Sequence, residues 1–402
     1  MTMPDDARTF PWRRGCPYLP PTEYAALRKA EPVRVALASG RRAWLFSRHS
    51  DVRQMLADPA VSSDMAAPGY PLHFEAPVEV LEQLRPVMLS YDPPEHTGQR
   101  RLVTNEFTRR HVEVLRPRIR QIAEDRVDAL LDAGRGADLV ALVSVPAPSL
   151  VICELLGVPS ADRGHFLART RDLVAVDVAP EQRGRAQGEL HEYLAGLLEG
   201  KRVEPGDDLL SRLLERNAQE DGTVLDHEGL VGMATVLLVG GHETTASMIS
   251  LGVVGLLDAP DQLAVVREDP ALWPSAVDEL LRFFSIADLV TSRVAVRDTV
   301  VGDTLVRAGE GLIGLTAAAN HDEDEFPGAA SIDVRRSSRR HLAFGRGVHQ
   351  CVGQNLARLE LEVVLETIFR RLPGLALDRP LAPADVKDDS GIFGLHELRV
   401  TW

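Results

Sequence analysis

The spacing of apolar residues divides the chain into long helical stretches and two short regions of strand character. Apolar residues recur every three or four positions, the period of an amphipathic helix, over residues 111–132, 185–202, 226–258, 275–284 and 353–371. Residues 34–46, "RVALASGRRAWLF", predict a β-hairpin. The stretch "RVAVRDTVVGDTLVRAGEGLIGL" from residue 293 predicts two or three strands interrupted by Gly302 and Gly309. The pattern therefore predicts a mainly α protein with a small β region.

Size and composition narrow the class of protein. The chain has 402 residues without a Ser/Gly-rich linker, a repeat or a low-complexity tract, so we expect a single domain over residues 1–402. A formal net charge of −14 disfavours nucleic acid and anionic membranes as partners. The start of the chain is polar and Pro-rich, and the longest apolar run, residues 230–241, is too short to span a bilayer. With only three cysteines, the chain is expected to be cytoplasmic, without a membrane anchor.

A glycine-rich loop places a cysteine before a predicted helix, in "HLAFGRGVHQCVGQNLARLE", residues 341–360. Free N–H groups and the helix dipole at such a position favour a thiolate, which is a nucleophile or a metal ligand. A dinucleotide loop is disfavoured because Gln350 replaces the third glycine of G-x-G-x-x-G. A zinc site is disfavoured because Cys16 and Cys153 are far away in sequence. An inert core cysteine, a nucleophile and a haem ligand remain open from the loop alone.

The segment "FGRGVHQCVG" resembles the haem-binding loop of the cytochrome P450 family, F-G-x-G-x-[HR]-x-C-x-G. The residues at its fixed positions are Phe344, Gly345, Gly347, His349, Cys351 and Gly353. The resemblance implies the triangular prism fold of that family and haem b as cofactor, with Cys351 as the axial thiolate on iron. It also places Phe344 against the ligand side of the haem, and Arg346 and His349 near its proximal face. Such a thiolate donates electron density that favours O–O cleavage.

A second motif interrupts the longest apolar helix, in "LLVGGHETTASM", residues 237–248. Taken alone it could be a buried helix with a tolerated kink, since internal glycines cost about 1 kcal/mol each. "HETTA" lacks the second histidine of a zinc protease motif, because Ala246 stands there. Beside Cys351, the stretch resembles the family's distal motif [AG]-G-x-[DE]-T-[TS]. The resemblance implies that Gly240 leaves room for O₂, and that Glu243 and Thr244 supply protons to the distal oxygen.

Two further segments match structural and cofactor-binding patterns. Glu279 and Arg282 in "ELLR" are spaced for a helical ion pair that is usually a solvated surface feature. Here they lie among apolar residues, so we expect a buried pair with a further partner. The resemblance of "IDVRR" to the family's "FDxxR" names Arg336 as that partner, bracing the cysteine loop; Ile332 departs from the usual Phe.

In "DPPEHTGQRR", residues 92–101, Asp92 is expected to cap a helix, with Glu95 completing a capping box. His96 and Arg100 then share one helix face, a pattern that by itself also fits a solvated basic surface. The resemblance pairs them with a haem propionate and assigns Arg293 and His349 to the other propionate-binding positions. Gly98 departs from the bulkier residue usual in the family.

The resemblance also implies a substrate pocket, a reaction and partners. Its pocket residues are Val236, Val239, Gly240, Ala287, Leu289, Val290, Ile392 and Phe393, together with the segments around 64–90 and 163–190. Within those segments, the polar side chains are His73, Glu75, Arg85, Arg169 and Arg171. We expect a haem-thiolate monooxygenase that uses O₂ to hydroxylate or epoxidise a bulky hydrophobic molecule. The first-ranked substrate class is a macrolide or other polyketide.

Electrons are expected from ferredoxin and ferredoxin reductase, because the chain carries no flavin, nicotinamide or iron–sulfur motif. The alternatives are a steroid, secosteroid or xenobiotic hydroxylase of the same family, a peroxygenase that uses H₂O₂ directly, and a non-catalytic haem-binding or sensor protein. The Glu243–Thr244 pair disfavours the peroxygenase, which can dispense with a proton relay. A sensor would need Cys351 but not Thr244.

Overall fold

The computed structural model describes residues 10–12, 14, 19–72, 87–164, 180–220, 224–287, 289–387 and 392–402. Its helices are α1 (Glu23–Leu27), α2 (His49–Met55), α4 (Glu95–Thr104), α5 (Arg109–Glu113), α6 (Arg116–Ala133), α7 (Pro146–Leu156), α9 (Pro180–Val203), α10 (Leu209–Gln219), α11 (His227–Asp258), α12 (Pro260–Glu268), α13 (Trp273–Phe284), α14 (Thr316–Ala319) and α15 (Gln354–Arg371). The strands are β1 (Val33–Ala36), β2 (Arg42–Phe46), β3 (Val61–Ser62), β4 (Ala137–Asp138), β5 (Ser292–Ala295), β6 (Thr299–Val301), β7 (Thr304–Val306), β8 (Gly311–Gly314), β9 (Ala376–Leu377), β10 (Val386–Lys387), β11 (Gly394–Leu395) and β12 (Arg399–Thr401).

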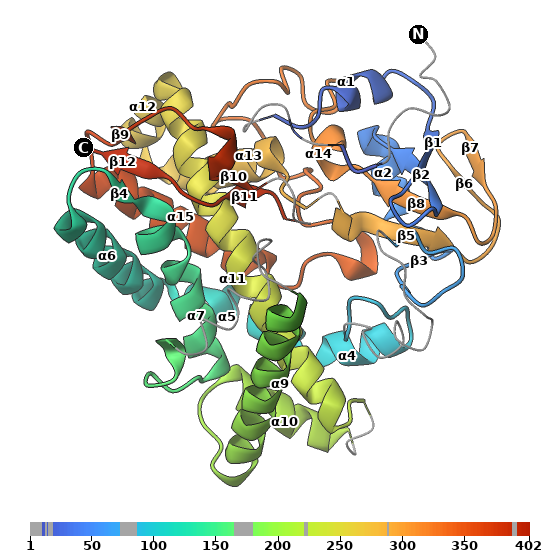
Figure 1. Ribbon diagram of the computed structural model, residues 1–402, viewed down its shortest axis with the longest axis horizontal. Helices are drawn as coiled ribbons and strands as arrows, with labels where there is room; N and C mark the ends of the chain where they lie inside the picture. Colours follow the sequence, from blue (N-terminus) through green and yellow to red (C-terminus); the bar gives the residue numbers. More distant parts are fainter. Residues whose placement is uncertain are drawn as a thin grey trace.

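One group of strands, β1, β2, β3, β5, β6, β7 and β8, lies at one side of the molecule, and the small sheet of β4, β12 and β9 lies on the opposite side, near the C-terminus (Figure 1). The main sheet has the order β1-β2-β8-β5-β3, in which β2 and β8 run parallel and the other pairs are antiparallel. The predicted hairpin over 34–46 is confirmed by β1 and β2. The region from residue 293 forms four strands rather than two or three, because β6 and β7 make a separate hairpin. The predicted mainly α fold with a small β region is confirmed.

Helix α11 crosses the middle of the helical part (Figure 1). The side chain of its N-cap residue, Asp226, accepts a hydrogen bond from the N–H of Gly229 (2.8 Å), which satisfies one of the free donors at the helix start. The helix is then continuous for 32 residues, so the glycines at 240 and 241 do not break it. Near its end, a Cβ at Gly255 would lie 2.8 Å from the Phe284 ring, so the absent side chain lets α13 pack closely.

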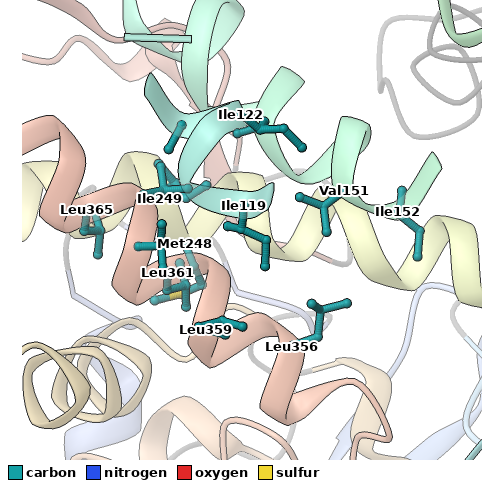
Figure 2. Packing of buried hydrophobic residues seen from close by; sticks show 14 of the residues in the cluster. Ile119, Ile122, Val151, Ile152, Met248, Ile249, Leu356, Leu359, Leu361 and Leu365 are labelled. Carbon is teal, nitrogen blue, oxygen red and sulfur yellow. The ribbon is translucent and has the colours of Figure 1, made fainter. Parts of the chain in front are cut away.

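The largest core lies where α6, α7, α11 and α15 meet. Figure 2 shows aliphatic side chains from all four helices pointing toward one another. The ten labelled side chains are Ile119, Ile122, Val151, Ile152, Met248, Ile249, Leu356, Leu359, Leu361 and Leu365, and all of them are buried. Packing at this density fixes α11 and α15 relative to each other, and these two helices carry the distal motif and the cysteine loop.

Most predicted helix boundaries agree with the structure, with one instructive exception. The stretch 111–132 is divided into α5 and α6. Pro117 lies in the first turn of α6, where its missing N–H is tolerated, whereas it would remove a hydrogen bond from a continuous helix. Among the described helices, none is by itself long and apolar enough to cross a bilayer. Only α11 and α12 taken together, a pair bent by 103°, are both long and apolar enough among the described helices.

Candidate active site

The loop that carries Cys351 is folded back on itself by backbone hydrogen bonds. The N–H of Cys351 donates to the carbonyl of Phe344, and the N–H of Gly345 donates to the carbonyl of Leu342 (both 2.9 Å). Gly347 has a φ of +77°, a left-handed conformation that glycine adopts without steric penalty. A Cβ there would lie 2.3 Å from the carbonyl oxygen of Leu56, just after α2. The loop therefore needs glycine at this position for space as well as for conformation.

The Cys351 thiol lies directly before α15, as predicted from the sequence. Its side chain is in contact with solvent, but protein atoms surround the sulfur closely. The resulting desolvation raises the pKa of the thiol. The N–H groups of Gly353 and Gln354 and the guanidinium groups of Arg100 and Arg358 act in the opposite direction, because each stabilises a negatively charged sulfur. These groups suit a thiolate that shares its charge with a cation.

Two imidazole rings lie close together beside the loop, with their planes inclined by 52°. The ring centroids of His96, on α4, and His349, in the loop, are 4.3 Å apart. His96 is only 1% exposed, yet neither of its ring nitrogens has a hydrogen-bond partner among the described residues. Burial lowers the pKa of His96 to about 4, with the neighbouring His349 and Arg100 contributing. A buried polar group without a partner is costly, so these nitrogens mark a position where a hydrogen-bonding ligand fits.

Two arginines complete the cationic part of the site. Arg100, one turn beyond His96 on α4, donates to the carbonyl of Gln350 (2.7 Å) and so ties α4 to the cysteine loop. Arg293, on β5, is 9% exposed and donates to the carbonyl of Ser292 (2.7 Å). Burial lowers the pKa of both guanidinium groups. Both remain cations, because arginine has a very high intrinsic pKa.

The expected role of Asp92 as a helix cap is wrong. Helix α4 begins at Glu95 with Pro94 in the N-cap position and no side-chain cap. The Asp92 carboxylate instead accepts hydrogen bonds from the Ser62 hydroxyl and the Ser63 N–H, and lies 3.8 Å from His349 Nε2. Although burial opposes ionisation, these partners hold the pKa of Asp92 well below its usual range. The Asp92 carboxylate therefore binds two serines in and beside β3 instead of the free N–H groups at the start of α4.

The distal motif lies on α11, as predicted. The Thr244 hydroxyl donates to the carbonyl of Gly240 (2.8 Å), so the lone pairs of its oxygen remain available to accept a hydrogen bond. A Cβ at Gly240 would meet no atom within 4 Å, whereas one at Gly241 would press on Ile152 at 3.1 Å. Gly240 therefore faces open space, and Gly241 allows α7 to approach.

The Glu243 carboxylate has a partner that the sequence analysis missed. Its Oε1 accepts a hydrogen bond from the ammonium group of Lys387, on β10, in a largely buried ion pair whose side chains are 13% and 10% exposed. The two residues are 144 positions apart, so no local sequence signal could have identified the pair. An unpaired acid in an apolar helix would be costly, and that cost was the only hint that a cation must lie nearby.

The predicted structural pair is brought together with its third member. Glu279 and Arg282 are both fully buried and form two hydrogen bonds of 2.8 Å. Arg336 donates to Glu279 Oε1 (3.1 Å), and the Ser338 hydroxyl donates to Glu279 Oε2 (2.5 Å). Ile332, where the family usually has Phe, does not disturb this arrangement.

A second network beside this pair was not anticipated. Asp278 accepts a hydrogen bond from Arg358, on α15 (2.7 Å), and lies 3.5 Å from the His341 ring. Although burial acts against it, the His341 and Arg358 contacts lower the pKa of Asp278. The Arg358 guanidinium also lies over the Phe344 ring, 4.6 Å from its centroid. Asp278 thus orients a cation that reaches toward Cys351.

The predicted pocket residues are only partly described. Val236, Val239 and Gly240 share one face of α11 at helical spacing. Phe393 is buried under the guanidinium of Arg14, 3.8 Å from the ring centroid, whereas Val290 is 61% exposed. Ala287 and Ile392 are half-buried. The Leu289 side chain and the polar residues His73, Glu75, Arg85, Arg169 and Arg171 lie outside the described part of the structure.

The combination of a thiolate loop, an acid–alcohol pair on a long helix and a helix-rich fold defines a haem-thiolate protein. The chain matches the family model described as Cytochrome P450 over residues 271–373. Pentalenic acid synthase of Streptomyces avermitilis is 46% identical over 395 residues, covering 98% of this chain and 97% of that protein. The 20-oxo-5-O-mycaminosyltylactone 23-monooxygenase of Streptomyces fradiae is 42% identical, covering 98% and 92%. The crystal structure of cytochrome P450 MoxA from Nonomuraea recticatena is 49% identical, with a TM-score of 0.91 over 98% of each chain.

The chain therefore belongs to the cytochrome P450 family. It is a P450 monooxygenase with haem b as cofactor, acting on a small molecule with O₂. The residues present fit this cofactor: a thiol faces N–H donors and two cations, and the unpaired nitrogens of His96 lie beside Arg100. A carboxylate-bearing group would satisfy that imidazole and those cations.

Gly347→Ala should disrupt the cysteine loop. The added Cβ meets the Leu56 carbonyl and the backbone is held at positive φ, so we expect destabilisation on the order of 3 kcal/mol and reduced haem retention. The measurements are denaturant unfolding and haem content per protein.

The matched control is Gly40→Ala, which has the same φ of +77° but no atom within 4 Å of the added Cβ. It should cost only about 1 kcal/mol and retain haem. Equal behaviour of the two variants would show that the contact with Leu56 is unimportant.

Proposed function

We propose that the cysteine loop and its cations hold the haem through this chain's own residues. Cys351 supplies the axial thiolate, and Phe344, Gly345, Arg346 and Gly353 form the loop that surrounds it. His96, Arg100, Arg293 and His349 bind the propionates, although His349 also shares its Nε2 with the Ser63 hydroxyl (2.9 Å). The observation that carries this assignment is His96, a buried imidazole without a protein partner beside Arg100.

Glu243 and Thr244 form the proton-delivery pair. When bound, the haem activates O₂ for insertion into a C–H or C=C bond, a reaction that consumes two electrons and two protons and releases water. Thr244 is oriented by its bond to the Gly240 carbonyl, and Glu243 is held one residue away on the same helix. An acid beside an alcohol can pass protons through a short hydrogen-bonded chain. Glu279, Arg282 and Arg336 act structurally, as the brace behind the loop.

The substrate is a bulky and mostly apolar molecule, and a macrolide or other polyketide is the first-ranked class. Val236 and Val239 present an aliphatic face beside Gly240, whose missing side chain leaves space. Binding then depends on burial of apolar area, roughly 25 cal/mol per Å². The relative from Streptomyces fradiae is named for a sugar-bearing lactone, which supports this class. A steroid, secosteroid or xenobiotic fits the same aliphatic face and is the alternative.

The proposed electron donor is a ferredoxin, which a ferredoxin reductase reduces in turn. We place the protein in the cytoplasm and treat residues 1–402 as a single domain. The basic residues expected to surround the proximal face are Arg101, Arg109, Arg110, Arg339, Arg340 and Arg346. Arg101 and Arg340 are paired with Glu220 and Glu325 (both 2.8 Å). Arg110 and Arg346 are exposed and form no ion pair with another described side chain, so they are the stronger candidates for docking.

Cys351→Ser should abolish the thiolate signature. Wild-type protein, reduced and exposed to CO, should show the strongly red-shifted Soret band of thiolate ligation, and the variant should lack it. The control is Cys153→Ala, which removes the buried thiol of α7 and should keep the band. A wild-type protein that binds haem without this band would contradict the ligand assignment.

The substrate class is tested by spectral titration of the ferric protein. A macrolide or steroid-sized ligand should produce a low-spin to high-spin shift, because it fills the space beside Gly240 and displaces water. Turnover of the same ligand with ferredoxin, reductase and NADH should then give an oxygenated product. The proposal fails if camphor-sized molecules give the fullest shift and no macrolide or steroid gives any.

Ferredoxin reduction of this protein should depend on salt and on the unpaired arginines. Arg110→Glu and Arg346→Glu should each slow electron transfer from an acidic ferredoxin, and raised ionic strength should slow the wild type, because opposite charges steer association. Arg297→Glu, at an exposed position between β5 and β6, is the charge-matched control and should have no effect. Rates that ignore both salt and these substitutions would refute the docking surface.

A further inference from the structure

The hairpin formed by β10 and β11 is seated on the same helix face that carries Glu243. Lys387 and Gly394 are opposite each other in the antiparallel register of the two strands, so their side-chain positions point to the same side of the hairpin. Lys387 reaches Glu243. A Cβ at Gly394 would lie 2.4 Å from the hydroxyl oxygen of Ser247. Glu243 and Ser247 are one helical turn apart, so a single pair of opposed hairpin residues contacts two consecutive turns of α11.

The hairpin is also anchored at the start of β11. The N–H of Phe393, the residue before β11, donates to the carbonyl of Ile286 (2.8 Å), just beyond α13. This bond and the Gly394 contact leave the hairpin little freedom to move along α11. The Lys387 ammonium is therefore delivered to Glu243 by a fixed backbone rather than by a flexible loop. Its charge also contributes to lowering the pKa of the neighbouring His242, after the larger effect of burial.

The ion pair involves only one of the two oxygens of the Glu243 carboxylate. Lys387 occupies Oε1, whereas Oε2 has no protein partner among the described residues. The carboxylate is thus held in one orientation with one oxygen engaged and the other available. Thr244, the next residue, donates its own proton to the Gly240 carbonyl and so offers only lone pairs.

We propose that Lys387 is a positioning residue for proton delivery, which fixes Glu243 through Oε1 so that Oε2 takes up protons from water and passes them toward Thr244. In each transfer Oε2 gains one proton from water and then releases the same proton, so the carboxylate is unchanged after each cycle. This inference rests on the proposed role of Glu243 and extends the machinery to a residue that belongs to no motif. Lys387 acts through Glu243 and does not touch the reacting atoms.

A double-mutant cycle on stability tests the pair without any substrate or electron donor. The variants are Lys387→Met, Glu243→Gln and the two combined, and the measurement is the unfolding midpoint of the haem-containing protein. Each single change leaves one buried charge unpaired, so each should lower the midpoint. The combined variant should lose clearly less than the sum of the two losses. Strictly additive losses would show that the two groups do not interact.

Product formed per NADH tests the positioning role with any substrate that the wild type oxidises. Lys387→Met should lower this ratio on the order of tenfold, less than the 10²- to 10⁴-fold contribution of a proton-transfer group itself. Lys387→Arg should restore most of it, because the cation returns. The combined variant should match Glu243→Gln alone, since Lys387 has no effect once the carboxylate is gone. Thr244→Ala provides the reference for a broken relay.

Two further variants separate positioning from general damage. Gly394→Ala pushes the hairpin away from Ser247 without changing either charge, and should lower product per NADH as Lys387→Met does. Lys29→Met removes an exposed lysine and should change neither readout. An unchanged ratio in Lys387→Met, or effects of Lys387→Met and Glu243→Gln that multiply, would overturn the proposal. Failure of the proposed substrate class would leave the stability cycle intact, so the two failures are distinguishable.

Discussion

The buried guanidinium of Arg282 is the interaction on which the proximal half of the site depends. All five of its N–H groups are satisfied: two by Glu279, and the others by the backbone carbonyls of Asn320, Ala329 and Ser331. A fully buried cation is tolerable only when its charge is paired and every donor is used. Arg282 therefore fixes two chain segments, at Asn320 and at residues 329–331, relative to its own helix. Removal of Glu279 would leave a buried charge that these carbonyls could not neutralise.

This fixed point is connected to the cysteine by a continuous series of hydrogen bonds. Asn320, whose carbonyl binds Arg282, accepts from the N–H of Leu342 through its side chain (2.7 Å). The Leu342 carbonyl binds Gly345, and the Phe344 carbonyl binds the N–H of Cys351. The sulfur is thus located by rigid backbone contacts rather than by its own packing. A metal ligand needs this kind of external support, because its orientation must be set before the metal is bound.

The sequence predicted the parts of this arrangement that obey local rules. Helical periodicity located α11 and α15, and the spacing of Glu279 and Arg282 among apolar neighbours indicated a buried pair, because charges in such surroundings need partners. What could not be predicted depends on contacts between distant segments. Asp92 has the sequence context of a helix cap, yet two serines near β3 compete successfully for its carboxylate. The sequence around Lys387 does not indicate a role for it, because its ion pair with Glu243 forms only when the β10–β11 hairpin packs on α11.

Two neighbouring carboxylates on α13 bind different partners, and each stabilises a different part of the site. Glu279 faces the Arg282 brace, whereas Asp278 faces Arg358 and His341. Arg358 reaches from α15 to the Phe344 ring and opposes the effect of burial on the Cys351 thiol. Because Asp278 partly neutralises Arg358, the cation favours a thiolate at Cys351 while leaving most of the negative charge on the sulfur. A free cation in that place would hold the charge more tightly, so the acid behind Arg358 limits how strongly this cation withdraws charge from the Cys351 sulfur.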